Sequence, residues 1–105
     1  MKLVTIETIP GQSFEALDTV KGTVVYSKNF GRDFMAGMKT LVGGEITGYT
    51  EMLNEARQIA TKRMVDEAQA MGADAIVNIR FATASIMQGA AEITAYGTAV
   101  RILGG

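Results

Sequence analysis

The chain has 105 residues, which suits a single domain, and its ten Lys and Arg residues nearly balance its eleven Asp and Glu residues. A net charge of −1 argues against nucleic acid as a partner, because neutralising phosphates requires a basic surface. The absence of His and Cys excludes a Ser-His-Asp triad, a cysteine nucleophile, disulfides and the usual zinc sites. Acid–base chemistry would therefore fall to Asp, Glu, Lys or Tyr.

The N-terminal quarter of the sequence has the pattern of two strands. Residues 2–8 alternate apolar and polar side chains, which predicts a β-strand rather than the continuous apolar core of a signal peptide, and Pro10-Gly11 predicts a turn after it. Residues 15–27 predict a second strand, in which Gly22 indicates a bulge or the close approach of another backbone segment. No stretch reaches the ~18 apolar residues of a membrane helix, so we expect a cytoplasmic protein without a membrane partner.

The apolar period then lengthens to between three and four residues. Residues 32–42 predict a short amphipathic helix that ends at Gly43-Gly44. A longer helix is predicted over about 45–71, and Gly72 is placed to form its left-handed cap. Two pairs of opposite charges at i,i+4 spacing are expected on its outer face: Lys62 with Asp66, and Arg63 with Glu67.

The final third of the chain returns to a period of two. A third strand begins after Asp74, residues 83–90 predict a loop with Gln88-Gly89 near its tip, and residues 91–103 predict a last strand that is apolar on both faces. Simple alternation places one set of side chains on one face of the third strand: Ala75, Val77, Ile79 and Phe81.

The order β-β-α-α-β-β predicts one α+β domain over residues 1–105, an antiparallel sheet with one short and one long helix on one face. Strands and helices do not alternate along the chain, which excludes a doubly wound dinucleotide-binding fold.

The length of the second helix favours assembly. A helix over 45–71 would be ~40 Å long at 1.5 Å per residue, whereas a compact chain of this length has a radius of gyration of only ~13 Å. The helix would overhang the domain, and Ala56, Ala60 and Ala68 permit another backbone to approach it. These features favour a homo-oligomer over a monomer. The alternative is that the helix breaks at Gly48 and that a neighbouring element covers the sheet.

The double glycine between the two predicted helices marks the candidate binding region. A Gly-rich turn that enters a helix can expose N–H groups to an anion, although no Walker loop follows here and a tight turn between helices explains the pair equally. Polar residues near the turn form the predicted ligand site: Arg32, Asp33, Glu45, Tyr49 and Arg57. The alternative is a small enzyme in which Asp33 or Glu45 is the general base and Arg57 or Tyr49 gives electrophilic support.

Metal binding is a third hypothesis. Thioethers suit Cu(I), but Met35 and Met38 lie on the apolar stripe of the first predicted helix, where Met usually fills the core. Carboxylates at helical spacing could bind a hard cation, without the spacing of an EF-hand: Glu51, Glu55, Asp66 and Glu67. A solvated helix face is the simpler interpretation of these acids, and we expect neither a resident metal site nor a cofactor.

Several blocks of the sequence, taken in order, resemble the YbjQ family of small bacterial proteins: Arg32-Asp33-Phe34, Gly43-Gly44-Glu45, Gly72-Ala73-Asp74-Ala75 and Gly97-Thr98-Ala99-Val100. The resemblance covers nearly the whole chain. It implies a fold like the dodecin subunit, assembled into a ring-shaped homopentamer, in a family labelled "putative heavy-metal binding" with no established enzymatic activity. We therefore expect a non-catalytic homo-oligomer of the YbjQ type that binds a small ligand or an ion at a subunit junction.

Overall fold

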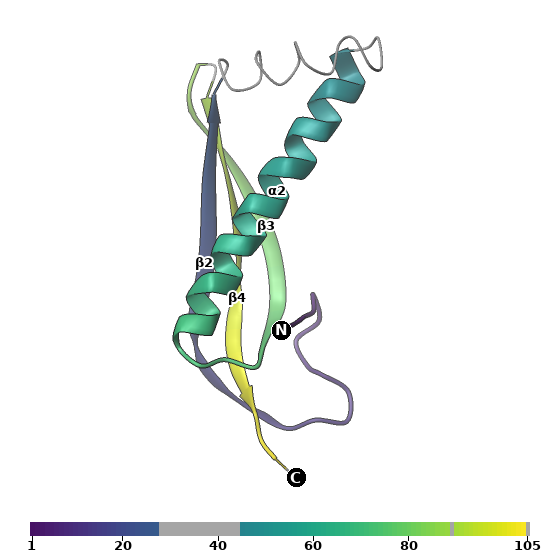
Figure 1. Ribbon diagram of the computed structural model, residues 1–105, viewed down its shortest axis with the longest axis vertical. Helices are drawn as coiled ribbons and strands as arrows, with labels where there is room; N and C mark the ends of the chain where they lie inside the picture. Colours follow the sequence, from purple (N-terminus) through teal and green to yellow (C-terminus); the bar gives the residue numbers. More distant parts are fainter. Residues whose placement is uncertain (28–44, 89, 105) are drawn as a thin grey trace.

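The computed structural model of the chain describes residues 1–27, 45–88 and 90–104. The secondary-structure elements, in chain order, are β1 (Lys2–Leu3), β2 (Phe14–Ser27), α2 (Glu45–Ala70), β3 (Ala75–Met87) and β4 (Ala90–Ile102). The strands form one sheet in the order β1-β3-β4-β2, and α2 crosses one face of it diagonally (Figure 1). The predicted α+β class is confirmed. The predicted helix over 32–42 lies outside the described residues.

The long helix α2 runs without a break from Glu45 to Ala70, so the alternative of a break at Gly48 is wrong. Gly72 has a φ of 77°, which confirms the predicted left-handed cap, and its N–H donates to the Gln69 carbonyl oxygen at 3.1 Å. Figure 1 shows that the N-terminal end of α2 lies farther from the strands than its C-terminal end does. The apolar face of α2 contributes five buried side chains to the core: Met52, Ala56, Ala60, Met64 and Ala68.

The helix and β2 pack almost backbone to backbone at Gly22. A Cβ atom added there would overlap the Ala60 carbonyl oxygen and the Met64 amide nitrogen. Gly22 was expected to mark either a bulge or the close approach of another backbone segment, and the structure shows the close approach. The bulge in β2 lies elsewhere, between Ala16 and Asp18.

The core consists of two clusters, one on each face of the sheet. Under α2 the strands contribute Val20, Val24, Ile76, Ile79, Ile93, Ala95 and Ala99. On the opposite face a smaller cluster joins Ile9, Ala75, Val77 and Val100. The segment that precedes β2 thus covers part of the second face, which is why the last strand is apolar on both sides.

The first predicted strand is largely wrong. Only Lys2–Leu3 forms β1, and it pairs parallel to β3, whereas the predicted sheet was wholly antiparallel. The chain continues alongside β3 without regular pairing: the Val4 N–H donates to the Ile76 carbonyl at 3.0 Å, and the Asn78 N–H donates to the Ile6 carbonyl at 2.8 Å. The alternating side chains of residues 2–8 fit this extended path, but alternation alone cannot show that most of the segment lacks the regular hydrogen bonds of a β-strand.

The predicted alternation of side chains along β3 is wrong after Val77. Asn78 adopts a left-handed conformation with a φ of 57°, and the register with β4 shifts between Val77 and Arg80. This bulge inserts an extra residue, so Ile79 joins Ile76 under α2 while Val77 lies on the other face. A period of two cannot predict a bulge, although Asn is one of the residues that adopts this conformation readily.

The predicted loop over 83–90 is also wrong. β3 continues to Met87 and β4 begins at Ala90, so a tight turn at Gln88 joins two long antiparallel strands. Residues 81–88 are exposed, so no buried face imposes an alternating pattern on their sequence.

Candidate functional site

The structure does not test the predicted ligand site as a group. Arg32 and Asp33 lie outside the described residues, as do Gly43-Gly44 and the pair Met35 and Met38. Glu45 and Tyr49 lie in the first turns of α2, where the backbone alone is described. Arg57 is exposed, and its Nη1 donates to Asn54 Oδ1 on the same helix at 3.3 Å. The cluster therefore stays a prediction.

Two of the described carboxylates form ion pairs on the surface. Asp66 forms the predicted ion pair with Lys62, at 3.0 Å, and Glu15 pairs with Arg101 at 3.2 Å. Within residues 1–27, 45–88 and 90–104 there is no group of three or more Asp and Glu side chains able to hold a metal ion. The buried side chains of these ranges are all hydrophobic.

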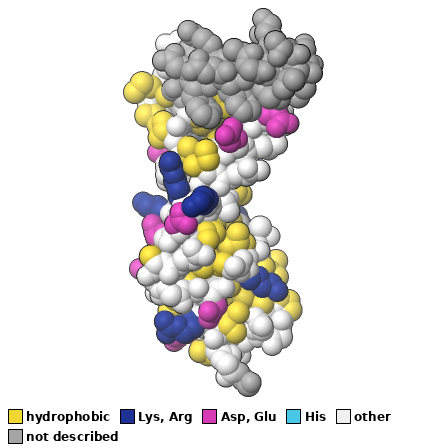
Figure 2. Space-filling view, in the orientation of Figure 1, with side chains coloured by type: hydrophobic (Ala, Val, Ile, Leu, Met, Phe, Trp, Pro, Cys, Tyr) yellow, Lys and Arg dark blue, Asp and Glu magenta, His cyan; other side chains and the backbone are white. Residues whose placement is uncertain are grey.

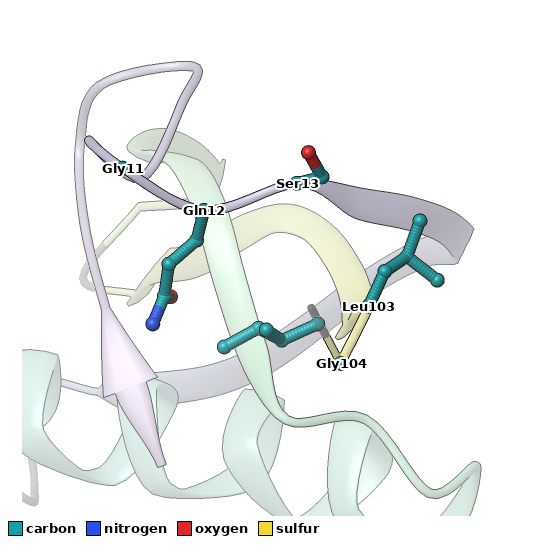
Figure 3. Close-up of a pocket in the computed structure, with 6 residues that line it drawn as sticks. Gly11, Gln12, Ser13, Leu103 and Gly104 are labelled. Carbon is teal, nitrogen blue, oxygen red and sulfur yellow. The ribbon is translucent and has the colours of Figure 1, made fainter.

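A hollow of about 650 Å³ lies where β2 begins and β4 ends (Figure 3). The described residues around it are Gly11, Gln12, Ser13, Ile102, Leu103 and Gly104. The side chain of Gln12 points to the opposite side from those of Ser13 and Leu103, whose backbones are joined by a hydrogen bond of 2.9 Å from the Leu103 N–H to the Ser13 carbonyl (Figure 3). The described lining carries no charge, so it offers no ionic anchor for a ligand.

Side chains cover part of the outer edge of β2, between Asp18 and Thr23. Glu67 Oε1 accepts a hydrogen bond from the Lys21 N–H at 3.3 Å, and Arg63 Nη1 donates to the Thr23 carbonyl at 2.6 Å. The predicted ion pair between Arg63 and Glu67 is therefore wrong, because both side chains reach across to the strand. Closer to the start of β2, Asp18 Oδ1 accepts from the Thr19 N–H at 2.7 Å. Side-chain contacts of this kind prevent an edge strand from pairing with another chain.

The first part of β3 is closed in another way, by the N-terminal segment. The Ile79 N–H donates to the Val4 carbonyl at 3.2 Å, and Arg80 Nη1 donates to the Thr5 carbonyl at 2.7 Å. The guanidinium of Arg80 therefore holds the N-terminal segment against the sheet.

Beyond Arg80 none of the residues that the structure describes pairs with the outer edge of β3. Backbone groups of successive residues in a strand point alternately to its two neighbours. Since the Ile79 N–H points outward, the outward groups of the next residues belong to Phe81, Thr83 and Ser85. No described residue supplies a hydrogen-bond partner for them. We call residues 81–87 of β3 the open edge.

The open edge differs from the rest of the surface in composition. Phe81 and Ile86 are each 47% exposed and Met87 is 65% exposed. No residue from Phe81 to Ala91 is charged, and none is Pro. By contrast, Figure 2 shows charged side chains of both signs interspersed along the middle of the molecule.

None of the described helices combines the length and the apolar character that a bilayer crossing requires.

Comparisons with known proteins identify relatives over nearly the whole length of the chain. The YbjQ family model, described as "Putative heavy-metal-binding", matches residues 1–103. A UPF0145 protein of Clostridium novyi is 59% identical over 103 residues, which cover 98% of this chain and all of the relative. A UPF0145 protein of Thermus thermophilus is 56% identical over 99 residues, which cover 93% of this chain and 87% of the relative. Neither relative carries a name that states an enzymatic activity.

A solved structure supports the fold. The crystal structure of a DUF74-family protein of unknown function from Pediococcus pentosaceus matches with a TM-score of 0.70 over 98% of both chains. The two sequences are 17% identical, so the match concerns the fold alone.

Proposed function

Because the chain belongs to the YbjQ family, we propose that it is a non-catalytic homo-oligomer that binds a small ligand at the junctions between its subunits. On the family resemblance the assembly is a dodecin-like ring of five subunits, and its compartment is the cytoplasm. No observation among the described residues favours the enzyme alternative.

The main observation in favour of a homo-oligomer is the large solvent-exposed area of the chain. The chain exposes 6701 Å², whereas a compact monomer of 11.2 kDa exposes about 5,700 Å². The excess of about 1,000 Å² is similar to the ~800 Å² that each partner buries in a standard interface. The radius of gyration, 16.6 Å, likewise exceeds the ~13 Å of a compact domain of this length.

The proposed ligand site is the polar cluster predicted from the sequence: Arg32, Asp33, Glu45, Tyr49 and Arg57. Arg57 supports this placement, because its guanidinium is exposed and pairs with the neutral amide of Asn54 rather than with a carboxylate. A guanidinium in that position has donors left for an anionic ligand.

The residues of the chain do not fit a soft heavy-metal ion. Such ions are held by thiolates, imidazoles and thioethers, and the chain contains neither Cys nor His, which leaves only its methionines. Met52 and Met64 are buried under α2, so their thioethers serve the core. An ion at a subunit junction would have to be a hard cation held by carboxylate oxygens, and the proposal therefore gives priority to a small organic or inorganic anion.

Native mass spectrometry of protein purified gently from its own cells tests the proposal. We expect a pentamer that carries additional bound mass, and the Arg57→Ala variant should keep the pentamer and lose that mass. A monomer at micromolar concentration would overturn the assembly, and a bare oligomer in every preparation would overturn the ligand. Equilibrium dialysis with Cu(I), Zn²⁺ and Mg²⁺ checks the metal alternative, for which we expect no stoichiometric uptake.

A further inference from the structure

We propose that the part of the sheet face opposite α2 that carries residues 21–25, 80–84 and 92–96 packs against the same face of a second copy of this chain. We call it the exposed face. The contact is made by side chains on a face of the sheet, and it joins two of the proposed rings back to back. The inference therefore goes beyond the proposed ring, which it takes as given.

The exposed face consists of three rows of cross-strand neighbours. The first row is Lys21, Tyr96 and Arg80, the second is Thr23, Thr94 and Ala82, and the third is Val25, Glu92 and Ala84. Residues next to these in sequence pack under α2, among them Val24, Ile79 and Ile93. Because successive side chains of a strand point to opposite faces, the three rows lie on the face that α2 leaves free (Figure 1).

This half of the sheet face is open to solvent. Val25 is 56% exposed and Tyr96 is 44% exposed. The second core cluster, in which Val77 and Val100 pack against Ile9, lies at the other end of the same sheet face. A second layer over the exposed face would bury the Val25 and Tyr96 side chains, much as the N-terminal segment covers the other end.

The charges of the exposed face make it complementary to itself. Its cations are in the first row, whereas its one carboxylate, Glu92, is in the third, about 13 Å away along β4. A two-fold axis along the middle row would place the first row of each copy over the third row of the other. Each Glu92 then faces the Tyr96 hydroxyl of the second copy, with Lys21 beside it.

Lys21 and Glu92 are available for such pairing. Within the part of the chain that the structure describes, neither side chain has an ion-pair partner. Arg80 is engaged instead with the N-terminal segment, since its Nη1 donates to the Thr5 carbonyl at 2.7 Å. Lys21 is therefore the cation that we pair with Glu92 of the second copy.

The middle row is suited to burial at the axis. Thr23 Oγ1 and Thr94 Oγ1 lie 3.0 Å apart and form a hydrogen bond with each other. Because the two hydroxyls are already partnered, covering them does not leave both without a hydrogen bond. Ala82, the third residue of the row, is small enough to let the second sheet approach closely.

Symmetry decides where this contact lies. A two-fold contact closes on itself and cannot build a ring of five, so it has to lie between two rings. The exposed face measures roughly 15 × 15 Å, which is less than the ~800 Å² that each partner buries in a standard interface. Two free subunits would hold together weakly through it, whereas two rings present all their exposed faces at once and gain from their combined effect.

A second copy fits the exposed face better than a small anion does. An anion would be attracted to Lys21 but would leave Val25 uncovered and would be repelled by Glu92. A second copy satisfies the cation, the carboxylate and the apolar side chains together.

Analytical ultracentrifugation over a series of concentrations provides the test. We expect the wild type to form decamers that give pentamers on dilution before the ring itself opens. Glu92→Lys should raise the concentration at which rings pair by about a hundredfold or more, because every contact then sets Lys against Lys. The exchange of the two charges, Lys21→Glu with Glu92→Lys, should restore pairing to within about tenfold of the wild type.

Glu55→Lys is the matched control, because it changes the net charge equally at an exposed position of α2. It should pair like the wild type. Wild-type pentamers at every concentration, or unchanged pairing of Glu92→Lys, would overturn the inference and leave the ring standing. A wild-type dimer that Glu92→Lys dissociates would support the contact and overturn the ring.

Cross-linking tests the position of the axis even if Glu92→Lys does not fold. The chain has no Cys, so Ala82→Cys and Ala84→Cys each introduce a single thiol. Two copies of residue 82 would lie about 10 Å apart, the spacing of packed sheets, and two copies of residue 84 about 16 Å apart. We expect a bis-maleimide too short for the second distance to link Ala82→Cys several-fold more than Ala84→Cys. Equal yields, or more linking of Ala84→Cys, would overturn the inference.

Discussion

Gly22 is the residue at which the fold depends most directly on the lack of a side chain. Its hydrogen atoms face the backbone of α2, and a Cβ atom would overlap backbone atoms of Ala60 and Met64 that cannot rotate away. Gly22→Ala should therefore push the helix off β2 and lower the free energy of unfolding by about 3 kcal/mol or more, the upper range for overpacked cores. Urea denaturation measures this loss.

Gly104→Ala is the control for that substitution, because a Cβ atom at Gly104 meets nothing within 4 Å. It should leave the urea midpoint unchanged. Equal midpoints for wild type and Gly22→Ala would mean that α2 does not lie as close to β2 as described.

Asn78 controls the bulge in β3 through its left-handed backbone conformation. Asn adopts this conformation more readily than Ala, and Gly more readily than either. We expect Asn78→Ala to lower the unfolding free energy by about 1 kcal/mol and Asn78→Gly to change it by less, as measured by the same denaturation. Asn78→Gly as damaging as Asn78→Ala would indicate that the side chain, rather than the backbone conformation, matters.

At the scale of elements, α2 both covers β2 and closes its edge. Removing the carboxylate of Glu67 leaves the Lys21 N–H without its partner. Because the contact is exposed, we expect Glu67→Ala to lower the unfolding free energy by less than about 1 kcal/mol. The amide of Lys21 should nevertheless exchange several-fold faster, which hydrogen-exchange mass spectrometry or NMR can follow.

Lys62→Ala is the matched control, since it breaks the exposed ion pair with Asp66 without touching β2. It should leave the exchange of the Lys21 amide unchanged. If Glu67→Ala also leaves that exchange unchanged, the carboxylate does not close the edge.

The elements with a strong apolar period were predictable from the sequence, and those without one were not. α2 and β2 match their predicted bounds to within one residue, because each buries one regular stripe. Alternation does not predict the bulge at Asn78, because one inserted residue reverses the side of every later side chain. It predicts a loop rather than a strand over residues 83–87, because an exposed strand has no buried face to shape its sequence. The open edge was missed for the same reason, although the uncharged run from Phe81 to Ala91 was a visible signal.

At the scale of the whole molecule, the predicted overhang of the long helix agrees with the structure. α2 has 26 residues, and its N-terminal end stands away from the strands in Figure 1. The principal extents of the chain are 53 × 27 × 20 Å. An elongated subunit with exposed strands can gain apolar burial by assembly that it does not achieve alone. Of the predicted ligand cluster, Glu45, Tyr49 and Arg57 lie in the N-terminal half of α2, and Arg32 and Asp33 lie outside the described residues.

Assembly makes stability depend on protein concentration. If five folded subunits separate as they unfold, a tenfold increase in concentration stabilises each subunit by about 1 kcal/mol, because mass action favours the associated state. For a chain of about 100 residues that corresponds to a rise in Tm of roughly 5 °C. Differential scanning calorimetry of the wild type at 2, 20 and 200 μM, as approximate concentrations, measures this slope.

The wild type should melt at a lower temperature at each successive dilution, until the subunits are separate and the Tm becomes constant. A wild-type Tm that stays constant across the whole range would show that folding and assembly are not linked, and that the excess exposed surface is stable in a free subunit.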